Sequence, residues 1–299
     1  QDVVQAVVQA LPPLDVDVEE EDEVQEEQEV KPTLTVENEV KIAAEPVQLT
    51  EKTTAVATDP AGIMRRAVGR DVGDGSAVVD IMNKFPTDIR IQSHGVRALK
   101  GVIRGEASEV KPMDSAEEDD QAEDRREKAE DSSRLVVQMV INKMKQFPES
   151  LALQRDGLLC LAEYANQADQ HIPIITSSGG ILSLIDAMVA LPDDVPANMA
   201  GLSVLAHPKI ADESVVRVNP ESRRLVLSAM ERFPLNEQLQ GLSCLALANL
   251  SLRQDASMME IVSKGGLEIV VESMKRFNST ALVQAAGCWF IAIISGKNG

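Results

Sequence analysis

The sequence of 299 residues predicts an all-α protein of about five stacked helical repeats, preceded by a disordered acidic tail. Three observations support this prediction. A Met followed three residues later by Phe or Leu recurs at five places, which are Met82, Met144, Met188, Met230 and Met274. The residues before these Met positions have the apolar spacing of a helix. The acidic residues gather mainly in two segments outside this pattern.

A fixed register follows each Met. The tenth residue is an amide, the thirteenth is Gly or Ser, and the seventeenth is Leu or Ile. The amides are Gln92, Gln154, Asn198, Gln240 and Gln284. One register over five copies indicates a repeat array, whose period is about that of two- and three-helix solenoid repeats. The first interval between Met positions is 62 residues, against 42 or 44 in the others, so we place an insertion at about residues 105–133.

Each unit is expected to contain two main helices. The first ends near the Met, as in residues 181–188 and 267–274, where apolar residues follow helical spacing. Pro then ends it in most copies, because Pro lacks an N–H and biases the preceding residue away from the α region. The second helix runs from about the eighth to the twenty-first residue after Met, as in residues 239–252. An interior Gly costs about 1 kcal/mol relative to Ala, so its recurrence there indicates a close helix crossing.

A short additional helix is expected before the third and fifth units, at residues 170–177 and 256–264. The fourth unit has only a compressed connection, at residues 209–220. There we expect Asn219 to cap the next helix, with Pro220 at its first position. The fourth unit is therefore predicted to be a two-helix version of the repeat.

The run from Gly265 to Met274, followed by Val283 to Trp289, resembles an armadillo repeat, and Cys244 to Leu250 resembles the ending of that family's third helix. The variant is similar to armadillo regions of protist proteins and of leucine-rich-repeat kinases. The resemblance covers about residues 63–299 and implies an armadillo/HEAT-like, right-handed α-solenoid. Such arrays are scaffolds with many unrelated partners, so the resemblance indicates the fold more than the function.

Two acidic segments account for the net charge of −19. Residues 1–60 hold 16 acidic and 3 basic side chains, and residues 105–133 hold 12 and 4. We expect residues 1–62 to be a largely disordered tail, because this composition cannot bury enough apolar surface to offset the entropy of ordering. The insertion should be a loop or a solvated charged helix. Both segments could serve solubility, dock on a basic partner, or compete for the array's own groove.

The sequence gives little support for catalysis or for a cofactor. His94, His171 and His207 lack metal-ligand spacing, and no phosphate-binding loop is present. Nucleic-acid binding and membrane insertion are not expected either, because the array is nearly neutral and has no apolar run of membrane-spanning length. The three Cys, at positions 160, 244 and 288, are expected to be packing residues, and free thiols favour a cytoplasmic location. The cilium, the nucleus and organelles remain open.

The resemblance implies a concave groove lined by third helices, with its key positions fifteen and nineteen residues after Met. In nuclear-import adaptors these positions carry Trp and Asn, which here never occur in the same unit, so a receptor for nuclear localisation signals is not expected. The candidate groove residues are Arg97, Leu159, Glu163, Ser203, His207, Leu242, Leu245, Asn249, Trp289 and Ile293. Trp289 is the first candidate, because Trp is enriched at binding hot spots, although it could equally pack beneath a further repeat.

The sequence therefore predicts a non-enzymatic scaffold or adaptor that binds another protein through the concave face, the acidic segments, or both. One alternative is a regulatory armadillo region of a larger enzyme such as a multidomain kinase. Another is a structural subunit of a large ciliary or organellar assembly.

Overall fold

A computed structural model describes residues 59–68, 75–104, 119–213, 219–252 and 255–296. The described residues form 13 α-helices and one 3-10 helix, with no strand among them, so the predicted all-α fold is confirmed. In chain order the elements are α2 (Pro60–Val68), α3 (Ser76–Lys84), α4 (Ile89–Arg104), α5 (Asp119–Gln146), α6 (Leu151–Ala165), α7 (His171–Ser177), α8 (Gly180–Ala190), α9 (Val195–Leu205), η1 (Pro208–Asp212), α11 (Pro220–Arg232), α12 (Glu237–Ser251), α13 (Asp255–Ser263), α14 (Gly266–Arg276) and α15 (Ala281–Ser295).

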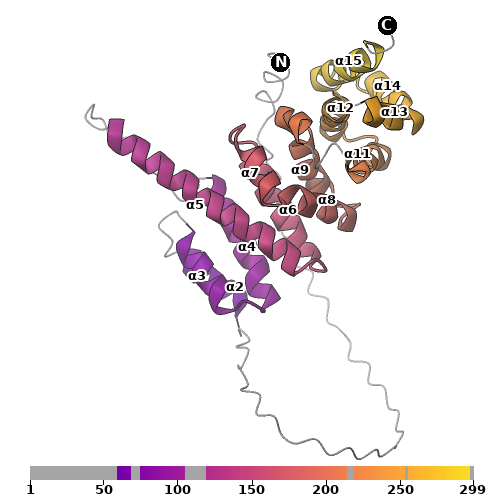
Figure 1. Ribbon diagram of the computed structural model, residues 1–299. Coiled ribbons are helices and arrows are strands. Elements are labelled where there is room, and N and C mark those ends of the chain that lie inside the picture. The colour runs from indigo at the N-terminus through magenta and orange to yellow at the C-terminus, as the bar shows by residue number, and fades with distance from the viewer. Residues whose placement is uncertain (1–58, 69–74, 105–118, 214–218, 253–254, 297–299) are drawn as a thin grey trace, which may run out of the picture. The chain divides into compact units, whose positions relative to one another are not determined.

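The helices stack in five consecutive units (Figure 1). The units are α2–α4, α5–α6, α7–α9, η1–α12 and α13–α15. The last helix of each unit contacts the last helix of the next, so that α4, α6, α9, α12 and α15 follow one another in order. We call these five the third helices. From the second unit on, the helix before each third helix likewise contacts its counterpart in the next unit, as α8 does with α5 and α11.

The short additional helices lie where the sequence places them, with one addition. α7 and α13 are present as predicted, and among the described residues before α11 the fourth unit has the 3-10 helix η1 in that place. Asn219 caps α11, since its side-chain oxygen accepts from the Glu221 N–H at 2.9 Å. The first unit also has a short helix, α2, that was not predicted. The sequence does contain a signal for this helix, because Asp59 stands directly before Pro60. In the structure the side chain of Asp59 accepts a hydrogen bond from the Gly62 N–H at 2.9 Å.

Part of the predicted insertion is helical. α5 begins at Asp119 and continues without a break to Gln146, so the helix that ends near Met144 has 28 residues. Residues 105–118 lie outside the described residues. The predicted acidic tail also lies outside them, apart from α2, which spans the expected boundary at residue 62.

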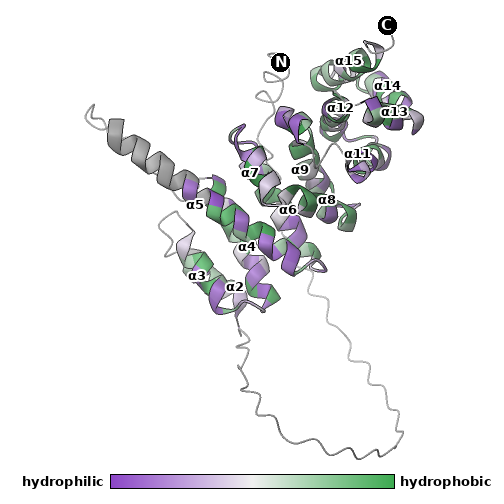
Figure 2. Cartoon of the chain, in the orientation of Figure 1, coloured by the Kyte–Doolittle hydropathy of each residue, from purple (hydrophilic) through white to green (hydrophobic). Residues whose placement is uncertain are grey.

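A continuous apolar core runs between the layers of helices. Hydrophobic stretches (green) mark α8, α9 and α15 in Figure 2. The largest side chains that are almost fully buried come from the first, second, third and fifth units, and include Met82, Leu99, Leu161, Ile175 and Phe290. The aliphatic residue seventeen after Met is among them in the first two units. Burial of this set supplies the main stabilising term of the stack.

The recurring Met and Gly are in direct contact. A Cβ added to Gly95, Gly157, Gly201 or Gly287 would lie 2.2–2.5 Å from the Sδ atom of the Met thirteen residues earlier. The Met side chain therefore lies against the backbone of the third helix, where only Gly leaves room for it. The close helix crossing expected from the recurring Gly is present in these four units.

The recurring amide side chain forms hydrogen bonds across the same helix crossing. We call the contacts of the Met, the small residue and the amide in one unit its joint. Gln92, Gln154, Gln240 and Gln284 each donate from Nε2 to the carbonyl oxygen of the Met ten residues earlier, at 2.7–2.9 Å. Each also donates to the Phe carbonyl three residues after that Met, at 2.8–3.1 Å. Asn198 is one methylene shorter. It keeps the bond to the residue three after Met, which is Leu191 here, and bonds to the carbonyl oxygens of Pro192 and Asp194 in place of that of the Met. The amide column thus satisfies backbone acceptors at the end of the preceding helix.

Candidate functional site

The ten candidate groove residues lie on the five third helices, except His207, which follows α9 directly. They differ sharply in exposure. Arg97, Leu159, Glu163, Trp289 and Ile293 are exposed or half-buried. Ser203, His207, Leu242, Leu245 and Asn249 are buried. The open candidates therefore belong to the first two units and to the last, and the buried ones to the third and fourth.

The open residues of the first two units form ion pairs between neighbouring helices. Arg97 on α4 reaches Asp156 on α6, with 3.1 Å between Nε and Oδ2, and Arg104 pairs with Glu163 at 2.9 Å. Asp156 is buried, and this burial raises the pKa of its carboxyl group while Arg97 acts in the opposite direction. The side chain of Arg97 remains 55% exposed. This part of the surface therefore presents charges that are already paired within the chain.

In the middle of the array the polar candidates join helices to one another. Asn249 on α12 donates to the carbonyl oxygens of Ala206 and His207, at 2.7 and 3.3 Å. Ser203 donates to the carbonyl oxygen of Ala200 at 2.8 Å and accepts from Asn166 at 3.4 Å. The side-chain amide of Asn249 is thus occupied by the end of the neighbouring helix.

The apolar anchors expected on α12 are core residues. The relative exposure of Leu242 is 1% and that of Leu245 is 2%. The reason is the close approach of the next third helix: a Cβ on Gly241 would meet Leu282 of α15 at 2.5 Å. α15 therefore lies directly against α12, and neither Leu is open to a partner in this structure.

Trp289 and Ile293 are half-buried on α15, at the last described unit. Cys288 beside Trp289 is exposed, so the expectation that it packs like Cys244 and Cys160 is wrong. Both Cys244 and Cys288 stand fourteen residues after Met. α15 follows α12 in the stack, whereas no third helix follows α15 among the described residues.

The described residues offer little for catalysis. They contain no group of three or more His, Cys, Asp and Glu residues that could hold a metal ion. A pocket between α8, α9 and α11 measures about 100 Å³, below the roughly 300 Å³ at which small-molecule sites begin. His171 is buried and stacks on Tyr164, with ring centroids 3.8 Å apart, and its Nδ1 lies 2.6 Å from the Tyr164 carbonyl oxygen. This histidine fills the core between α6 and α7.

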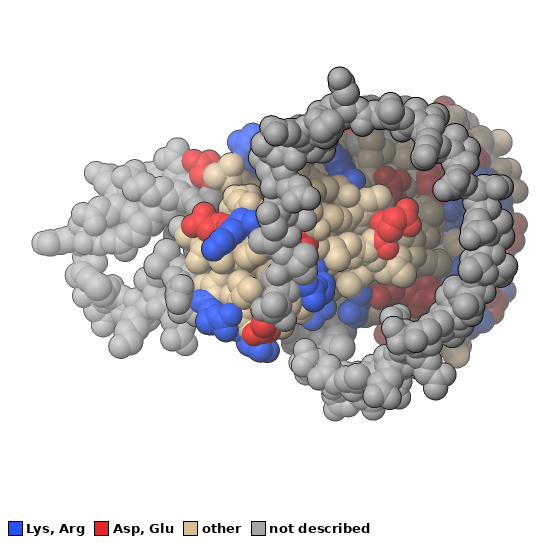
Figure 3. Space-filling model, turned by 90° about the horizontal axis from the view of Figure 1, so that it is seen from below, with Lys and Arg blue, Asp and Glu red and all other residues tan. Residues whose placement is uncertain are grey.

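The surface charges are mixed. Figure 3 shows Lys and Arg beside Asp and Glu over the face it displays, with no large area of one sign. Phosphate backbones require a basic face, so this face does not favour nucleic acid. Among the described helices, none alone has both the length and the apolarity to cross a membrane, and the pair α7 and α8 meets that test only jointly, with an 81° bend between them.

Two solved structures resemble the chain, and both are crystal structures of engineered proteins from the Northeast Structural Genomics Consortium. The first is 17% identical, covers 80% of this chain and 93% of its own, and has a TM-score of 0.51. The second is 16% identical, covers 82% and 95%, and has a TM-score of 0.47. No curated protein matches the sequence at a significant level.

A family model supplies the more specific match. The model described as LRRK2 ARM repeat matches residues 127–297, more than half of the 299 residues. The matched region spans most of α5 and everything described after it, including four of the five Met-to-amide joints. The chain therefore belongs to the LRRK2 ARM repeat family.

Proposed function

We propose that the chain is a non-enzymatic scaffold that binds another protein through the face formed by its third helices. Stacked third helices line the binding face of armadillo arrays, and a repeat stack presents a long surface without needing a catalytic pocket. The observation that carries the proposal is the uninterrupted contact of α4, α6, α9, α12 and α15 along the stack.

The open residues indicate two contact regions on this face. Trp289 and Ile293 form an apolar region on α15, and Leu159 lies between the ion pairs of Arg97 and Glu163 in the first two units. A half-buried Trp adds apolar area at a small entropic cost, which makes it the best single anchor. The paired charges would contribute orientation and specificity more than affinity.

A second candidate function is regulation of a larger enzyme. The family match favours it, because the chain resembles the armadillo regions of leucine-rich-repeat kinases. In that case the third-helix face would bind a catalytic part and hold it in one arrangement. The two functions share the same surface and differ in the partner.

The buried free thiols favour a reducing compartment such as the cytoplasm. Burial raises the pKa of Cys244 to about 12 and raises the pKa of Cys160 as well, so both are inert packing groups. Neither could form a disulfide without opening the core.

The test is quantitative affinity purification of the tagged full chain and three variants, which are Trp289→Ala, Leu159→Ala and the control Met259→Ala. Trp289→Ala removes the proposed anchor, and Met259→Ala shortens a side chain that is 61% exposed on α13 of the same unit. We expect at least one partner whose recovery falls about tenfold with Trp289→Ala and is unchanged with Met259→Ala, at equal helicity by circular dichroism. If Trp289→Ala and Leu159→Ala both leave every partner's recovery unchanged, the third-helix face is not the binding surface.

A further inference from the structure

The junction between the third and fourth units differs from the others. A short α-helix opens the third and fifth units, whereas the fourth opens with the 3-10 helix η1. His207 is the N-cap residue of η1, with φ −67° and ψ 135°, and its relative exposure is 5%. An imidazole therefore occupies a helix-capping position inside a junction between units.

The hydrogen bonds of His207 define its protonation state. Its Nδ1 accepts from the Lys209 backbone N–H at 3.2 Å. A ring nitrogen that accepts carries no proton, so this contact assigns the neutral ring with its proton on Nε2. The backbone carbonyl oxygen of His207 accepts from the Ile210 N–H at 3.0 Å and from the side chain of Asn249 at 3.3 Å. The capped turn, which opens the fourth unit, is thus tied to α12 of that unit.

Two charged groups face the ring from the elements around it. Asp169, in the turn between α6 and α7, places Oδ1 3.6 Å from Nε2, but its side chain is 55% exposed. Lys209 of η1 adds a positive charge, and α12 contributes Asn249, which is uncharged. Burial lowers the pKa of His207 below its usual value and Lys209 lowers it further, while Asp169 acts in the opposite direction.

We propose that His207 is a pH-sensitive switch at the junction of the third and fourth units, closed when its ring is neutral and opened when the ring is protonated. Protonation places a hydrogen on Nδ1, directly against the Lys209 N–H that it now accepts from. The cap bond is lost and two donors face each other. The turn that presents the Ala206 and His207 carbonyl oxygens to Asn249 then loses its anchor.

The lowered pKa of His207 determines how the stability of the closed junction changes with pH. The open junction exposes the ring to water, where its pKa is about 6.5, so the open form binds a proton more readily than the closed form. The full stability of the closed junction is present above about pH 6.5. It falls as the pH drops from there toward the lowered pKa of the closed form.

The test combines two measurements on the full chain at several pH values. NMR of the ring protons follows the three histidines, and hydrogen exchange measured by mass spectrometry follows residues 206–213, corrected for the intrinsic effect of pH. We expect His207 to titrate below its ordinary pKa. Hydrogen exchange at residues 206–213 should become about fivefold faster between pH 7.5 and pH 5.5, because loss of an N-cap shifts the opening equilibrium by about that factor.

Two variants separate this switch from a general loss of stability. His207→Asn keeps a good capping residue that cannot titrate, so junction exchange should become independent of pH. Asp169→Asn removes the group that favours the protonated ring in the closed junction, so the pKa of His207 should shift further down and junction exchange at pH 5.5 should exceed that of the wild type. Asp169 is exposed, so folding should not suffer. Equal pH dependence in the wild type and His207→Asn would overturn the proposal. So would a His207 that titrates at or above its ordinary pKa, or an Asp169→Asn variant with no shift.

Discussion

The side-chain amide of Gln240 donates to the backbone carbonyl oxygen of Met230 at 2.8 Å, and this bond replaces one that the helix cannot make. In an α-helix the carbonyl of Met230 would accept from the residue four positions later. That residue is Pro234, which has no N–H. In the first, second and fourth units the Pro and the amide are therefore linked: the Pro ends one helix and leaves an acceptor, and the amide from the next helix satisfies it.

We predict that Gln240→Leu lowers the free energy of unfolding by about 1–3 kcal/mol. The substitution replaces the amide by an apolar side chain of similar size, so it leaves the buried carbonyl oxygen of Met230 and the partly buried one of Phe233 without this donor. Urea denaturation of the full chain, followed by circular dichroism, measures the change. Gln238→Leu is the matched control, because Gln238 is half-buried on the same helix and should change stability by under about 0.5 kcal/mol. Equal effects of the two substitutions would show that the joint does not depend on the amide.

The residues that form this joint could be recognised in the sequence, but the contacts between them could not. The amide column, the small residue and the Pro were all visible, and they were sufficient to predict a repeat of two main helices. A further column was missed. The sixth residue after each Met is Asp88, Ser150, Asp194, Asn236 or Thr280, all of them helix-capping types. Four of these accept from the N–H three residues on, namely Asp88, Ser150, Asp194 and Asn236. That column would have placed the start of each third helix at the seventh residue.

The exposure of the candidate site could not be predicted in the same way. Register gives the position of a residue on its own helix, but burial depends on how closely the neighbouring helix lies. Leu242 and Leu245 are buried because Gly241 lets Leu282 approach, and these partners lie 41 residues apart in the chain. The register alone also cannot show that Asn249 donates to the end of α9. Both facts require the spacing between neighbouring third helices.

Gly201→Ala is predicted to destabilise the chain by about 1–3 kcal/mol, as overpacking of a core does. Ala is the better helix former, so the same substitution in an open helix would stabilise by about 1 kcal/mol. Here the added Cβ would lie 2.2 Å from the Sδ atom of Met188, which is fully buried and has little room to move. Thermal or urea unfolding of the full chain measures the loss.

A double-mutant cycle with Met188→Ala checks the cause of that loss. Met188→Ala removes the Sδ atom that the new Cβ meets. Met188→Ala should therefore lower the free energy of unfolding less in the Gly201→Ala background than in the wild type. Strict additivity would contradict a steric origin. Ser243 stands at the equivalent position of the fourth unit, and nothing in the structure explains why that unit accepts a side chain there.

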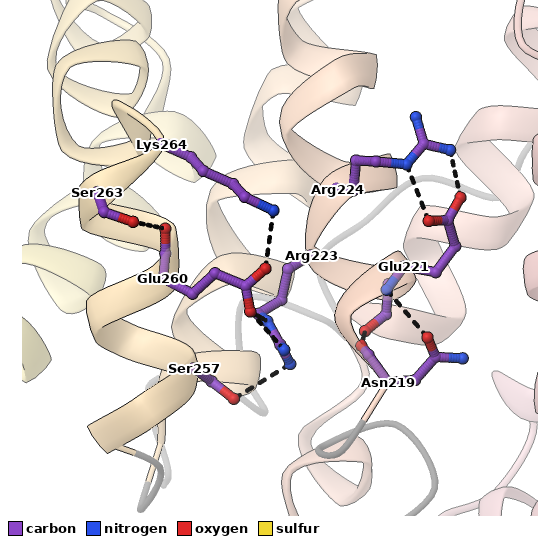
Figure 4. A network of polar contacts seen from close by, with 9 residues as sticks. Asn219, Glu221, Arg223, Arg224, Ser257, Glu260, Ser263 and Lys264 are labelled. Atoms are coloured by element: carbon purple, nitrogen blue, oxygen red, sulfur yellow. Dashed lines mark hydrogen bonds and ion pairs between the residues drawn. The ribbon is translucent and has the colours of Figure 1, made fainter.

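Two adjacent arginines on α11 give the sharpest comparison of buried and exposed ion pairs (Figure 4). Arg223 points to α13, where its Nε donates to Glu260 at 2.7 Å and its Nη1 donates to Ser257 at 3.2 Å. Arg224 bonds to Glu221 on its own helix, at 2.9 Å from Nε. The side chain of Arg223 is 7% exposed and that of Arg224 is 52% exposed. Of these two arginines, only Arg223 therefore joins the fourth unit to the fifth.

We predict that Arg223→Ala lowers the free energy of unfolding by about 2 kcal/mol, and Arg224→Ala by under about 0.5 kcal/mol. The first substitution removes a buried link and leaves Glu260 with Lys264 alone among the ion pairs described for it, whereas the second removes an exposed pair that water and salt already weaken. Hydrogen exchange of α13 is the more specific measurement, because the loss of Arg223 should speed exchange at residues 255–263 before it affects α9. Faster exchange of α13 with Arg224→Ala, or no change with Arg223→Ala, would mean that apolar contacts alone hold these two units together.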